Sequence, residues 1–308
     1  MTIFTAPPNQ NGLVLDSGDD LEVNNGGTAT DTTVNTDGTE NVRAGGISND
    51  TTVNSGGVEF IFAGGVANDT TISNTGHQRV LNGGISNYTT IGDRSLESVG
   101  DGGTSNHTTI NRGGTEGVVD GGVANDTVIN RGGTENAVGG TSNDTTINAG
   151  GVENVFEYGV ANHTTIGDHG DLKVLSGGVA NNTIIDRGGV ETISAGGHAN
   201  NVTFAGQSIL VSASPVGLSG TVANWQVGDA IDLVNTKVTA VNETGDTLTV
   251  TYGDDQKAAY TLAGQQADTH VTARSDGHGG SELILTPILG VQHHEATIHF
   301  GPGPHFLF

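Results

Sequence analysis

The most constraining feature of this 308-residue sequence is a run of near-identical copies of one 19-residue unit. A typical copy, residues 45–63, is GGISNDTTVNSGGVEFIFA. Successive copies begin 19 residues apart, except at one step of 18 between Gly121 and Gly139. A repeat this regular constrains the fold class more than any other property of the chain. The copies open at Gly26, Gly45, Gly64, Gly83, Gly102, Gly121, Gly139, Tyr158, Gly177 and Gly196.

The composition of the unit predicts one coil of a β-solenoid. Nineteen glycine-rich residues are too few for a helix pair, and glycine disfavours helices. The intervening Thr, Val, Ile and Asn residues favour short strands separated by tight corners. One copy cannot bury an apolar face alone, whereas stacked copies can. We therefore predict an all-β solenoid with 19-residue coils about 4.8 Å apart.

Three positions of the unit repeat as β-branched ladders. Counting the first glycine of each copy as position 1, these are positions 3, 9 and 17, and all three are predicted to line a narrow core. A thin core agrees with the hydrophobic content of 33%. Position 9 holds Val34, Val53, Ile72, Ile91, Ile110, Ile129, Ile147, Ile166, Ile185 and Phe204.

Position 5 is an almost uninterrupted series of asparagines. Stacked side-chain amides can donate to one neighbouring coil and accept from the other. We therefore predict a structural hydrogen-bonded ladder along the rod. Its members are Asn49, Asn68, Asn87, Asn106, Asn125, Asn143, Asn162, Asn181 and Asn200.

The charge balance limits the partners that the chain can have. Acidic residues number 34 against 10 basic residues, and the formal net charge is −24. Such a polyanion repels nucleic acid, so no nucleic-acid partner is predicted. No apolar run approaches 18 residues, so no transmembrane segment is predicted either. Residues 1–25 lack the basic and apolar regions of a secretory signal peptide, and the chain contains no cysteine.

Changes in the pattern divide the chain into four expected segments. Residues 1–25 form a lead-in, irregular up to residue 12, and a cap; residues 26–213 form the solenoid. Residues 214–289 are expected to be a small β domain that either caps the rod or stands as a separate sandwich, and residues 290–308 form a His-rich tail. In the third segment the strands are expected at 230–234, 237–241, 247–252, 258–262, 270–273 and 282–285.

Position 15 is an acidic ladder, which needs an explanation because stacked like charges repel. One interpretation is an exposed, solvated edge that Arg112, Arg131 and Arg187 partly neutralise. The other is a row of weak Ca²⁺ sites, since this ion prefers oxygen ligands. Neither an EF-hand nor a GGxGxDxUx loop occurs, so no recognised calcium motif decides between these two interpretations. The ladder comprises Glu40, Glu59, Gln78, Glu97, Glu116, Glu135, Glu153, Leu172 and Glu191.

Position 6 varies among Asp, His, Tyr and Asn, which indicates an outward side chain. Together with the threonines that follow, it predicts a flat polar face along the rod, suited to a repeating polymer or to a second rod. The competing interpretation is a face that only confers solubility. The candidate binding residues are Asp50, Thr51, Asp69, Thr70, His107, Thr108, Asp126, Thr127, Asp144, Thr145, His163 and Thr164.

Catalysis has little support in the sequence, and neither enzymatic activity nor a cofactor is predicted. No cysteine nucleophile, G-x-S-x-G or H-E-x-x-H motif is present. The strongest local break in the repeat carries Asp168, His169 and Asp171, which leaves a polysaccharide lyase or hydrolase as the alternative. A transition-metal site in the tail is a less favoured interpretation than a flexible segment. Its histidines are His293, His294, His299 and His305.

Copies such as GGVANDTTISNTG and GGTSNDTTINAGG resemble the passenger repeats of AIDA-type autotransporter adhesins. The resemblance extends from residue 26 to about residue 204. It implies a right-handed parallel β-helix that is secreted or displayed on the surface of a Gram-negative bacterium. It also implies adhesion, self-association or biofilm formation, with a second copy or a host or matrix polysaccharide or protein as partner.

The same resemblance implies modification by a dedicated heptosyltransferase, since passengers of this family can carry heptose on Ser or Thr. A carrier whose array is mainly a glycosylation substrate is therefore a further possibility. The candidate acceptors occupy position 4 of the unit: Ser48, Ser86, Ser105 and Ser142.

Overall fold

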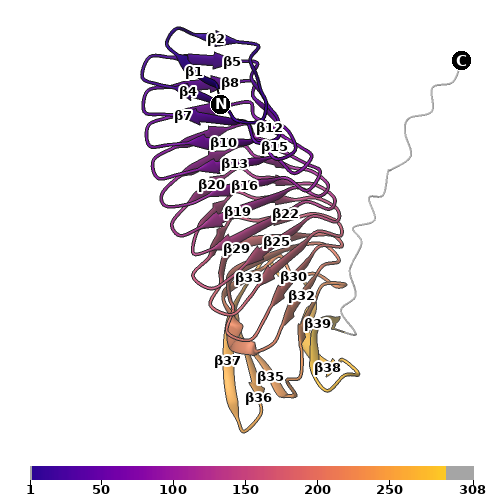
Figure 1. Ribbon diagram of the computed structural model, residues 1–308. Coiled ribbons are helices and arrows are strands. Elements are labelled where there is room, and N and C mark those ends of the chain that lie inside the picture. The colour runs from indigo at the N-terminus through magenta and orange to yellow at the C-terminus, as the bar shows by residue number, and fades with distance from the viewer. Residues whose placement is uncertain (1, 289–308) are drawn as a thin grey trace, which may run out of the picture.

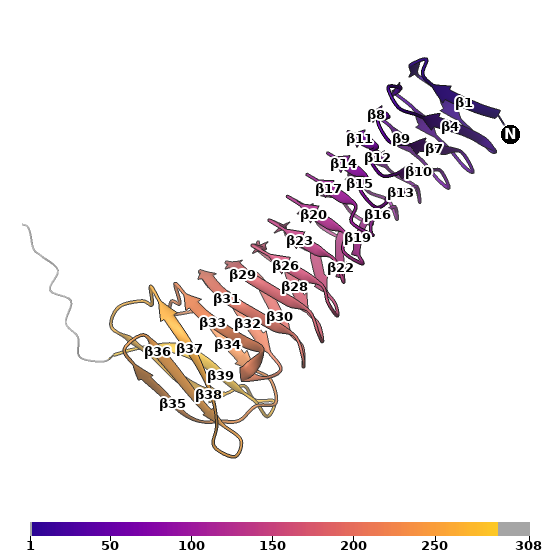
Figure 2. The ribbon, with the colours of Figure 1, turned by 90° about the vertical axis from the view of Figure 1, so that its left-hand side faces the viewer.

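The computed structural model describes residues 2–288, which form a parallel β-solenoid of about 12 coils with a β cap at its C-terminal end (Figures 1 and 2). The prediction of an all-β solenoid is confirmed. Helix within the described residues is confined to one short 3-10 turn, Pro215–Gly217. Residues 2–288 include no helix with the length and apolar character needed to cross a bilayer. The His-rich tail predicted for residues 290–308 lies outside the described residues.

Each coil contains three short strands, exemplified in the second copy by β8 (Ile47–Asn49), β9 (Thr52–Val53) and β10 (Val58–Ile61). Each strand pairs in parallel with the same strand of the next coil, so equivalent residues stack: Ile110 lies opposite Ile129. The predicted vertical register is confirmed. The chain changes direction at three corners, one after each strand of the coil.

The strands form three faces along the rod. The first face contains β1 (Thr2–Ala6), β4 (Asp19–Val23), β7 (Thr39–Val42), β10, β13 (His77–Val80), β16 (Leu96–Val99), β19 (Thr115–Val119), β22 (Thr134–Val138), β25 (Val152–Val155), β28 (Asp171–Val174), β30 (Val190–Ile193), β32 (Ile209–Ser212) and β34 (Ala230–Leu233). The second contains β2 (Gln10–Asn11), β5 (Thr28–Thr30), β8, β11 (Val66–Asn68), β14 (Ile85–Asn87), β17 (Thr104–Asn106), β20 (Val123–Asn125), β23 (Thr141–Asn143) and β26 (Val160–Asn162). The third contains β3 (Val14–Leu15), β6 (Thr33–Val34), β9, β12 (Thr71–Ile72), β15 (Thr90–Ile91), β18 (Thr109–Ile110), β21 (Val128–Ile129), β24 (Thr146–Ile147) and β27 (Thr165–Ile166). The second and third faces merge in β29 (Val179–Asp186) and β31 (His198–Ala205).

Two of the three ladders that the sequence predicts for the core are found there. Positions 9 and 17 are completely buried, as Val53 and Ile61 show. Position 3 lies on the outside, and Ile47 is 41% exposed. Because side chains alternate along a strand, the middle residue of β8, Ser48, faces inward instead. The prediction for position 3 is therefore wrong, and the small residues of position 4 form that wall.

The asparagine ladder of position 5 is confirmed. Asn68 Nδ2 donates to Asn49 Oδ1 at 2.9 Å, and Asn87 repeats this bond to Asn68. The same bond continues up to Asn181, whose amide donates to Asn162 at 3.0 Å. The ladder ties each coil to the next on the outer surface, in addition to the backbone pairing.

The N-terminal segment is more regular than predicted. β1 pairs in parallel with β4 over five residues, from Thr2 opposite Asp19 to Ala6 opposite Val23. The prediction of an irregular lead-in up to residue 12 is wrong. The reason is that Ala6 is fully buried and Phe4 packs against the core, so this segment completes the first coil.

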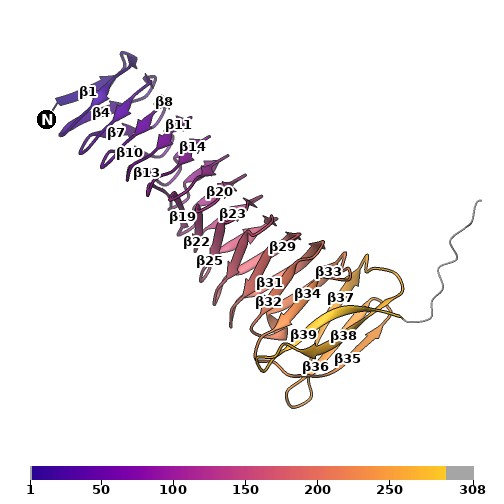
Figure 3. The ribbon, with the colours of Figure 1, turned by 90° about the vertical axis from the view of Figure 1, so that its right-hand side faces the viewer.

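The six strands predicted after residue 229 are all present. They are β34, β35 (Val238–Thr244), β36 (Thr247–Tyr252), β37 (Gln256–Ala263), β38 (Thr269–Ser275) and β39 (Ser281–Pro287). β34 continues the first face, and β33 (Leu218–Ala223) pairs in parallel with both β31 and β37. The remaining pairs are antiparallel hairpins that cover the end of the stack (Figure 3).

The cap shares one hydrophobic core with the coils. Trp225 is fully buried and its ring lies 5.9 Å from that of Phe204, the last member of the position 9 ladder. Tyr260 is also buried, and its hydroxyl donates to the Pro215 carbonyl at 2.7 Å. The cap therefore continues the rod and protects the edge of its last coil.

Candidate functional site

The position 6 residues form an exposed corner along the rod. Each adopts a left-handed backbone, with φ of +54° at Asp50 and +57° at His107, which turns the chain between the second and third faces. Neighbouring members interact: the Tyr88 and His107 rings stack at 4.9 Å, and His107 Nδ1 lies 3.6 Å from Asp126 Oδ2. The remaining predicted members, exposed like these, are Asp69, Asp144 and His163.

The threonines of position 7, predicted to share this polar face, lie inside the coil. After the left-handed corner residue the chain enters the third face, where position 7 points inward and position 8 outward, as in buried Thr51 and half-exposed Thr52. The prediction of a face that includes position 7 is therefore corrected. The buried threonines are Thr51, Thr70, Thr108, Thr127, Thr145 and Thr164.

The acidic ladder of position 15 is also inside the coil, where its seven glutamates are completely buried. In β10 the alternation of side chains turns Glu59 and Ile61 toward the core. The expectation of an exposed, solvated edge is wrong. Arg112 and Arg131 stand at an outer corner and cannot neutralise these carboxyls. The described residues include no group of three or more His, Cys, Asp or Glu side chains placed to hold a metal ion.

Two rows of hydroxyl groups face this ladder from the next coil. Ser48 Oγ donates to Glu40 Oε1 and Thr51 Oγ1 to Glu40 Oε2, both at 3.0 Å. Ser142 and Thr145 bind the two oxygens of Glu135 in the same way, at 2.6 and 3.2 Å. Where position 4 is serine in these coils, both carboxyl oxygens therefore have partners.

Where position 4 is alanine, Oε1 of the facing carboxyl has no hydrogen-bond partner among the described residues. Thr127 donates to Glu116 Oε2 at 3.1 Å, and Thr164 to Glu153 Oε2 at 3.0 Å. The Oε1 atoms of Glu116 and Glu153 have no hydrogen-bond partner among residues 2–288, nor does that of Glu59. Both oxygens of Glu191 lack one in the same described part of the chain.

Burial favours the neutral form of these carboxyls. It raises the pKa of Glu40 and Glu191 to about 8, and that of Glu97 and Glu135 to about 7. Burial and the neighbouring carboxyls also raise the pKa of Glu116 well above its usual value. Desolvation penalises a buried charge, and a second carboxyl one coil away adds repulsion. A protonated carboxyl also supplies an O–H donor, which a carboxylate lacks.

The serines predicted as glycosylation acceptors belong to this interior. Ser48 and Ser142 donate to glutamates, Ser86 donates to Gln78, and Ser105 lies 2.6 Å from Thr108 Oγ1. All four are buried, at most 1% exposed. A transferase cannot reach these hydroxyls in the folded coil, so the predicted acceptor positions are corrected.

The break at residues 168–171 carries exposed ion pairs. His169 Nδ1 lies 2.6 Å from Asp168 Oδ1, and their side chains are 80% and 67% exposed. Asp171 instead pairs with Lys173 at 3.0 Å. Two separate pairs of this kind do not form the enclosed constellation of acid and base that hydrolysis of a glycosidic bond requires.

Taken together, the narrow core, the hydrogen-bonded ladders and the exposed corners define an elongated parallel β-solenoid. A family model described as an adhesin of the bacterial autotransporter system, probable stalk, matches residues 9–57. A solved structure, a TibC-catalysed hyper-glycosylated fragment of TibA covering residues 55–350, is also similar. It is 29% identical, with a TM-score of 0.51, and the alignment covers 71% of this chain and 94% of that chain. Among curated protein sequences no match is found.

These two similarities agree with the repeat pattern and with the coil geometry. Both support an AIDA-type autotransporter passenger, an adhesin-like β-solenoid, as what this array is similar to.

Proposed function

We propose that this solenoid acts at or beyond the surface of a Gram-negative bacterium by lateral contact, in adhesion, self-association or biofilm formation. The observation that carries the proposal is the position 6 corner. It presents one exposed polar side chain per coil, held by a fixed backbone, at the pitch of the rod. A rigid row of this kind loses little conformational entropy when it meets a repeating partner. The outward threonines of position 8, such as Thr52 and Thr71, border the row.

Surface display tests this proposal. The chain, displayed on a non-aggregating Gram-negative host, is expected to make the cells settle or form biofilm. Carboxylates are strong hydrogen-bond acceptors, so the combined variant Asp50→Asn, Asp69→Asn, Asp126→Asn and Asp144→Asn should reduce settling. Asn182 and Asn201 adopt the same backbone at position 6, which indicates that asparagine preserves the fold.

The matched control changes four exposed aspartates with left-handed backbones elsewhere. These are Asp37, Asp101, Asp120 and Asp255. Their replacement by asparagine removes the same charge and should leave settling unchanged. Equal settling of both variants at equal display would contradict a role for the position 6 corner.

Binding rather than catalysis is part of the proposal. Incubation of the chain with neutral and acidic polysaccharides should release no reducing ends and no unsaturated products. Turnover that disappears in the Asp168→Asn or His169→Ala variant would replace the adhesive function with an enzymatic one.

Sugar modification is proposed for outward hydroxyls, with a heptosyltransferase as the partner enzyme. The solved neighbour is a hyper-glycosylated fragment, which supports testing this chain. In the folded coil the hydroxyls of position 8 are accessible, for example those of Thr71 and Thr146, both exposed. Peptide mass spectrometry after co-expression with a heptosyltransferase should find sugar on position 8 threonines and not on Ser48 or Ser142.

A further inference from the structure

The corner between the third and first faces carries an unusual row of cations. Arg94, Arg112 and Arg131 lie on three consecutive coils, and all three are exposed. Coils repeat at about 4.8 Å, so the row places three guanidinium groups along about 10 Å of the rod. The chain has only 10 basic residues and a net charge of −24, so this clustering is not a consequence of composition.

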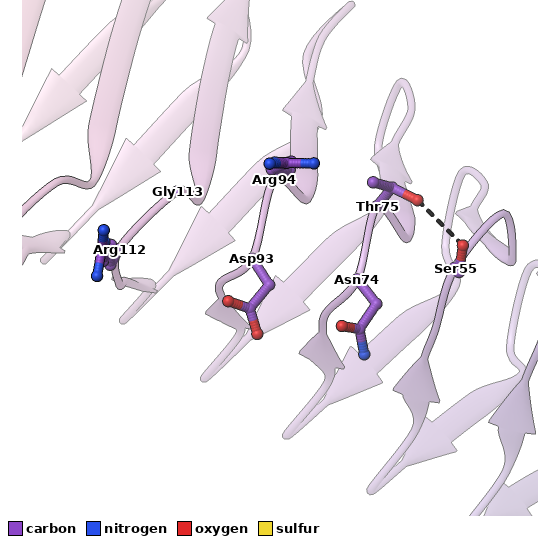
Figure 4. Close-up of a pocket in the computed structure, with 7 residues that line it drawn as sticks. All are labelled: Ser55, Asn74, Thr75, Asp93, Arg94, Arg112 and Gly113. Atoms are coloured by element: carbon purple, nitrogen blue, oxygen red, sulfur yellow. Dashed lines mark hydrogen bonds between the residues drawn. The ribbon is translucent and has the colours of Figure 1, made fainter.

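None of the three arginines forms an ion pair within the part of the chain that the structure describes. The ion pairs found in residues 2–288 involve other cations, such as Arg43 with Glu22 and Arg274 with Glu282. Asp93 lies on the same corner, and its side chain points away from Arg94 (Figure 4). Stacked like charges without a counter-charge are unfavourable, so an anionic ligand would relieve a repulsion already present.

The corner is hollowed beside these arginines. An open hollow of about 610 Å³ is lined by Asn74, Thr75, Asp93, Arg94 and Arg112 (Figure 4). A second hollow of about 320 Å³ continues from Arg112 to Arg131. Both volumes lie in the range of small-ligand sites, and together they form a shallow groove that runs along the rod.

The backbone holds the arginines in place. A side chain on Gly132 would come within 3.2 Å of Arg112 Cγ, and one on Gly150 within 3.1 Å of Arg131 Cγ. The stems of Arg112 and Arg131 therefore rest on the glycine of the following coil. Both glycines have φ of +75°, a conformation that also favours glycine. Stems supported in this way leave less conformational freedom to lose when a ligand binds.

An aromatic platform borders the same coils. Tyr88, 57% exposed, stacks on His107 at the corner that precedes strands β15 and β18. The arginine corner follows the same two-residue strands, and the outward hydroxyls of Thr90 and Thr109 lie between the two corners. An exposed aromatic ring offers apolar area with a polar edge, which suits the faces of sugar rings.

From this arrangement we propose that the arginine corner binds a linear polysaccharide that carries carboxylate or sulfate groups, aligned with the rod. Guanidinium groups bind both anions through paired N–H donors. The inference rests on the proposed adhesive function and names a class of ligand for it. A thin chain can follow the groove, whereas a second copy of this protein would bring its own net charge of −24 against the same negative charge.

Titration of the full chain with acidic polysaccharides tests the proposal. Polygalacturonate and hyaluronan represent carboxylate ligands, heparin represents sulfate ligands, and dextran is the neutral control. At low salt we expect binding of at least one acidic polymer and none of dextran, with weakening as salt rises. The variant Arg94→Gln, Arg112→Gln and Arg131→Gln should weaken this binding by about tenfold or more.

A control of equal charge is available in the chain. The variant Arg187→Gln, Lys237→Gln and Lys257→Gln also removes three exposed cations, one of them at the same position of another coil. It should bind almost as well as the parent. Equal losses in the two variants, or no binding of any acidic polymer at low salt, would overturn the proposal. So would a change confined to self-association in the arginine variant, which would assign the corner to a second copy.

The outcomes also separate this inference from the proposed function. If displayed cells settle but the purified chain binds no acidic polysaccharide, only the arginine-corner inference fails. If the chain binds but displayed cells neither settle nor form biofilm, the adhesive function fails instead.

Discussion

Coils with serine at position 4 and coils with alanine there differ in how they hydrogen-bond the buried carboxyl of position 15. Around Glu135, Ser142 and Thr145 donate to both carboxyl oxygens. Around Glu116, Ala124 leaves Thr127 as the one donor, and Oε1 has no partner in the described structure. A position 4 hydroxyl thus allows full hydrogen bonding of the carboxyl but does not ensure it, since Ser105 bonds Thr108 and Glu97 Oε1 has no partner in the described structure. The alanine coils depend more strongly on the carboxyl being neutral.

The ladder itself contains two neutral substitutes. Gln78 accepts from Ser86 and Thr89 and donates to Glu59 Oε2 at 2.7 Å, as a protonated glutamate could. Leu172 fills the same position without any hydrogen bond and is fully buried. An amide and an alkyl side chain both fit, which indicates that the position requires a neutral side chain of this size.

A lysine in the ladder should produce the largest effect. Glu116→Lys places an unpaired ammonium group in the core and should reduce the free energy of unfolding by more than about 3 kcal/mol. Glu135→Lys should cost less, because two hydroxyl oxygens remain to accept from the ammonium group. Urea titration of both variants, with Glu116→Gln as the matched neutral change, measures this order. An unchanged midpoint for Glu116→Lys would contradict the burial of the ladder.

Stability should fall as pH rises. Burial raises the folded-state pKa to about 8 for Glu40 and Glu191 and to about 7 for Glu97 and Glu135, so the folded chain keeps protons that the unfolded chain has released. The stability that these carboxyls contribute is therefore complete below about pH 4.5, the ordinary pKa of glutamate, and is lost as pH rises through 7 to 8. The thermal midpoint should fall by at least about 4 °C between pH 5 and pH 8.

Replacing three of the glutamates of alanine coils should flatten this pH dependence. The variant combines Glu116→Gln, Glu153→Gln and Glu191→Gln. Its control, Asp50→Asn, Asp69→Asn and Asp144→Asn, removes three exposed carboxylates and should retain the slope of the parent. Parallel slopes in all three proteins would show that the ladder does not hold its protons.

Removing a serine from a fully bonded coil should have a moderate effect. Ser142→Ala deletes the donor to Glu135 Oε1 and should cost about 1 to 2 kcal/mol of unfolding free energy. The matched control is Ser55→Ala at an exposed corner, expected within about 0.5 kcal/mol of the parent. A cost for Ser142→Ala no larger than that of the control would mean that the second hydroxyl is dispensable.

Adding a serine to an alanine coil should give the smallest effect. Ala124→Ser places a donor toward Glu116 Oε1 and should stabilise the chain by about 0.5 to 1 kcal/mol. Ala67→Ser, which faces the orphan oxygen of Glu59, should behave in the same way. Destabilisation in both would imply that these coils are too narrow for the extra oxygen.

The 19-residue period was enough to predict the solenoid, the register and the asparagine ladder, because each follows from stacking equivalent residues. The orientation of individual ladders was harder to predict. Ile47 and Glu59 were placed on the wrong sides because polarity suggested an apolar residue inside and an acid outside. Because side chains alternate along each strand, Ile47 faces outward and Glu59 faces inward. A hydroxyl group then hydrogen-bonds the buried carboxyl, as Thr70 does for Glu59.

A signal for this arrangement was present in the sequence. Position 7 is threonine in the copies that follow Glu40, Glu59, Glu97 and Glu116, although an outward position in a repeat of this kind would vary. Position 6 does vary, and it is exposed. From the sequence, Arg112 and Arg131 indicate only counter-charges for the acidic ladder, because their grouping with Arg94 on three consecutive coils has meaning only once the corners are located.

We infer that the folded interior holds a ladder of neutral glutamic acids. Infrared spectroscopy of the chain labelled with ¹³C at the glutamate side-chain carboxyl measures this directly. At pH 6 the folded protein should show a protonated-carboxyl band that disappears in urea and weakens in the Glu116→Gln, Glu153→Gln and Glu191→Gln variant. A spectrum at pH 6 with only ionised carboxylates would contradict the account.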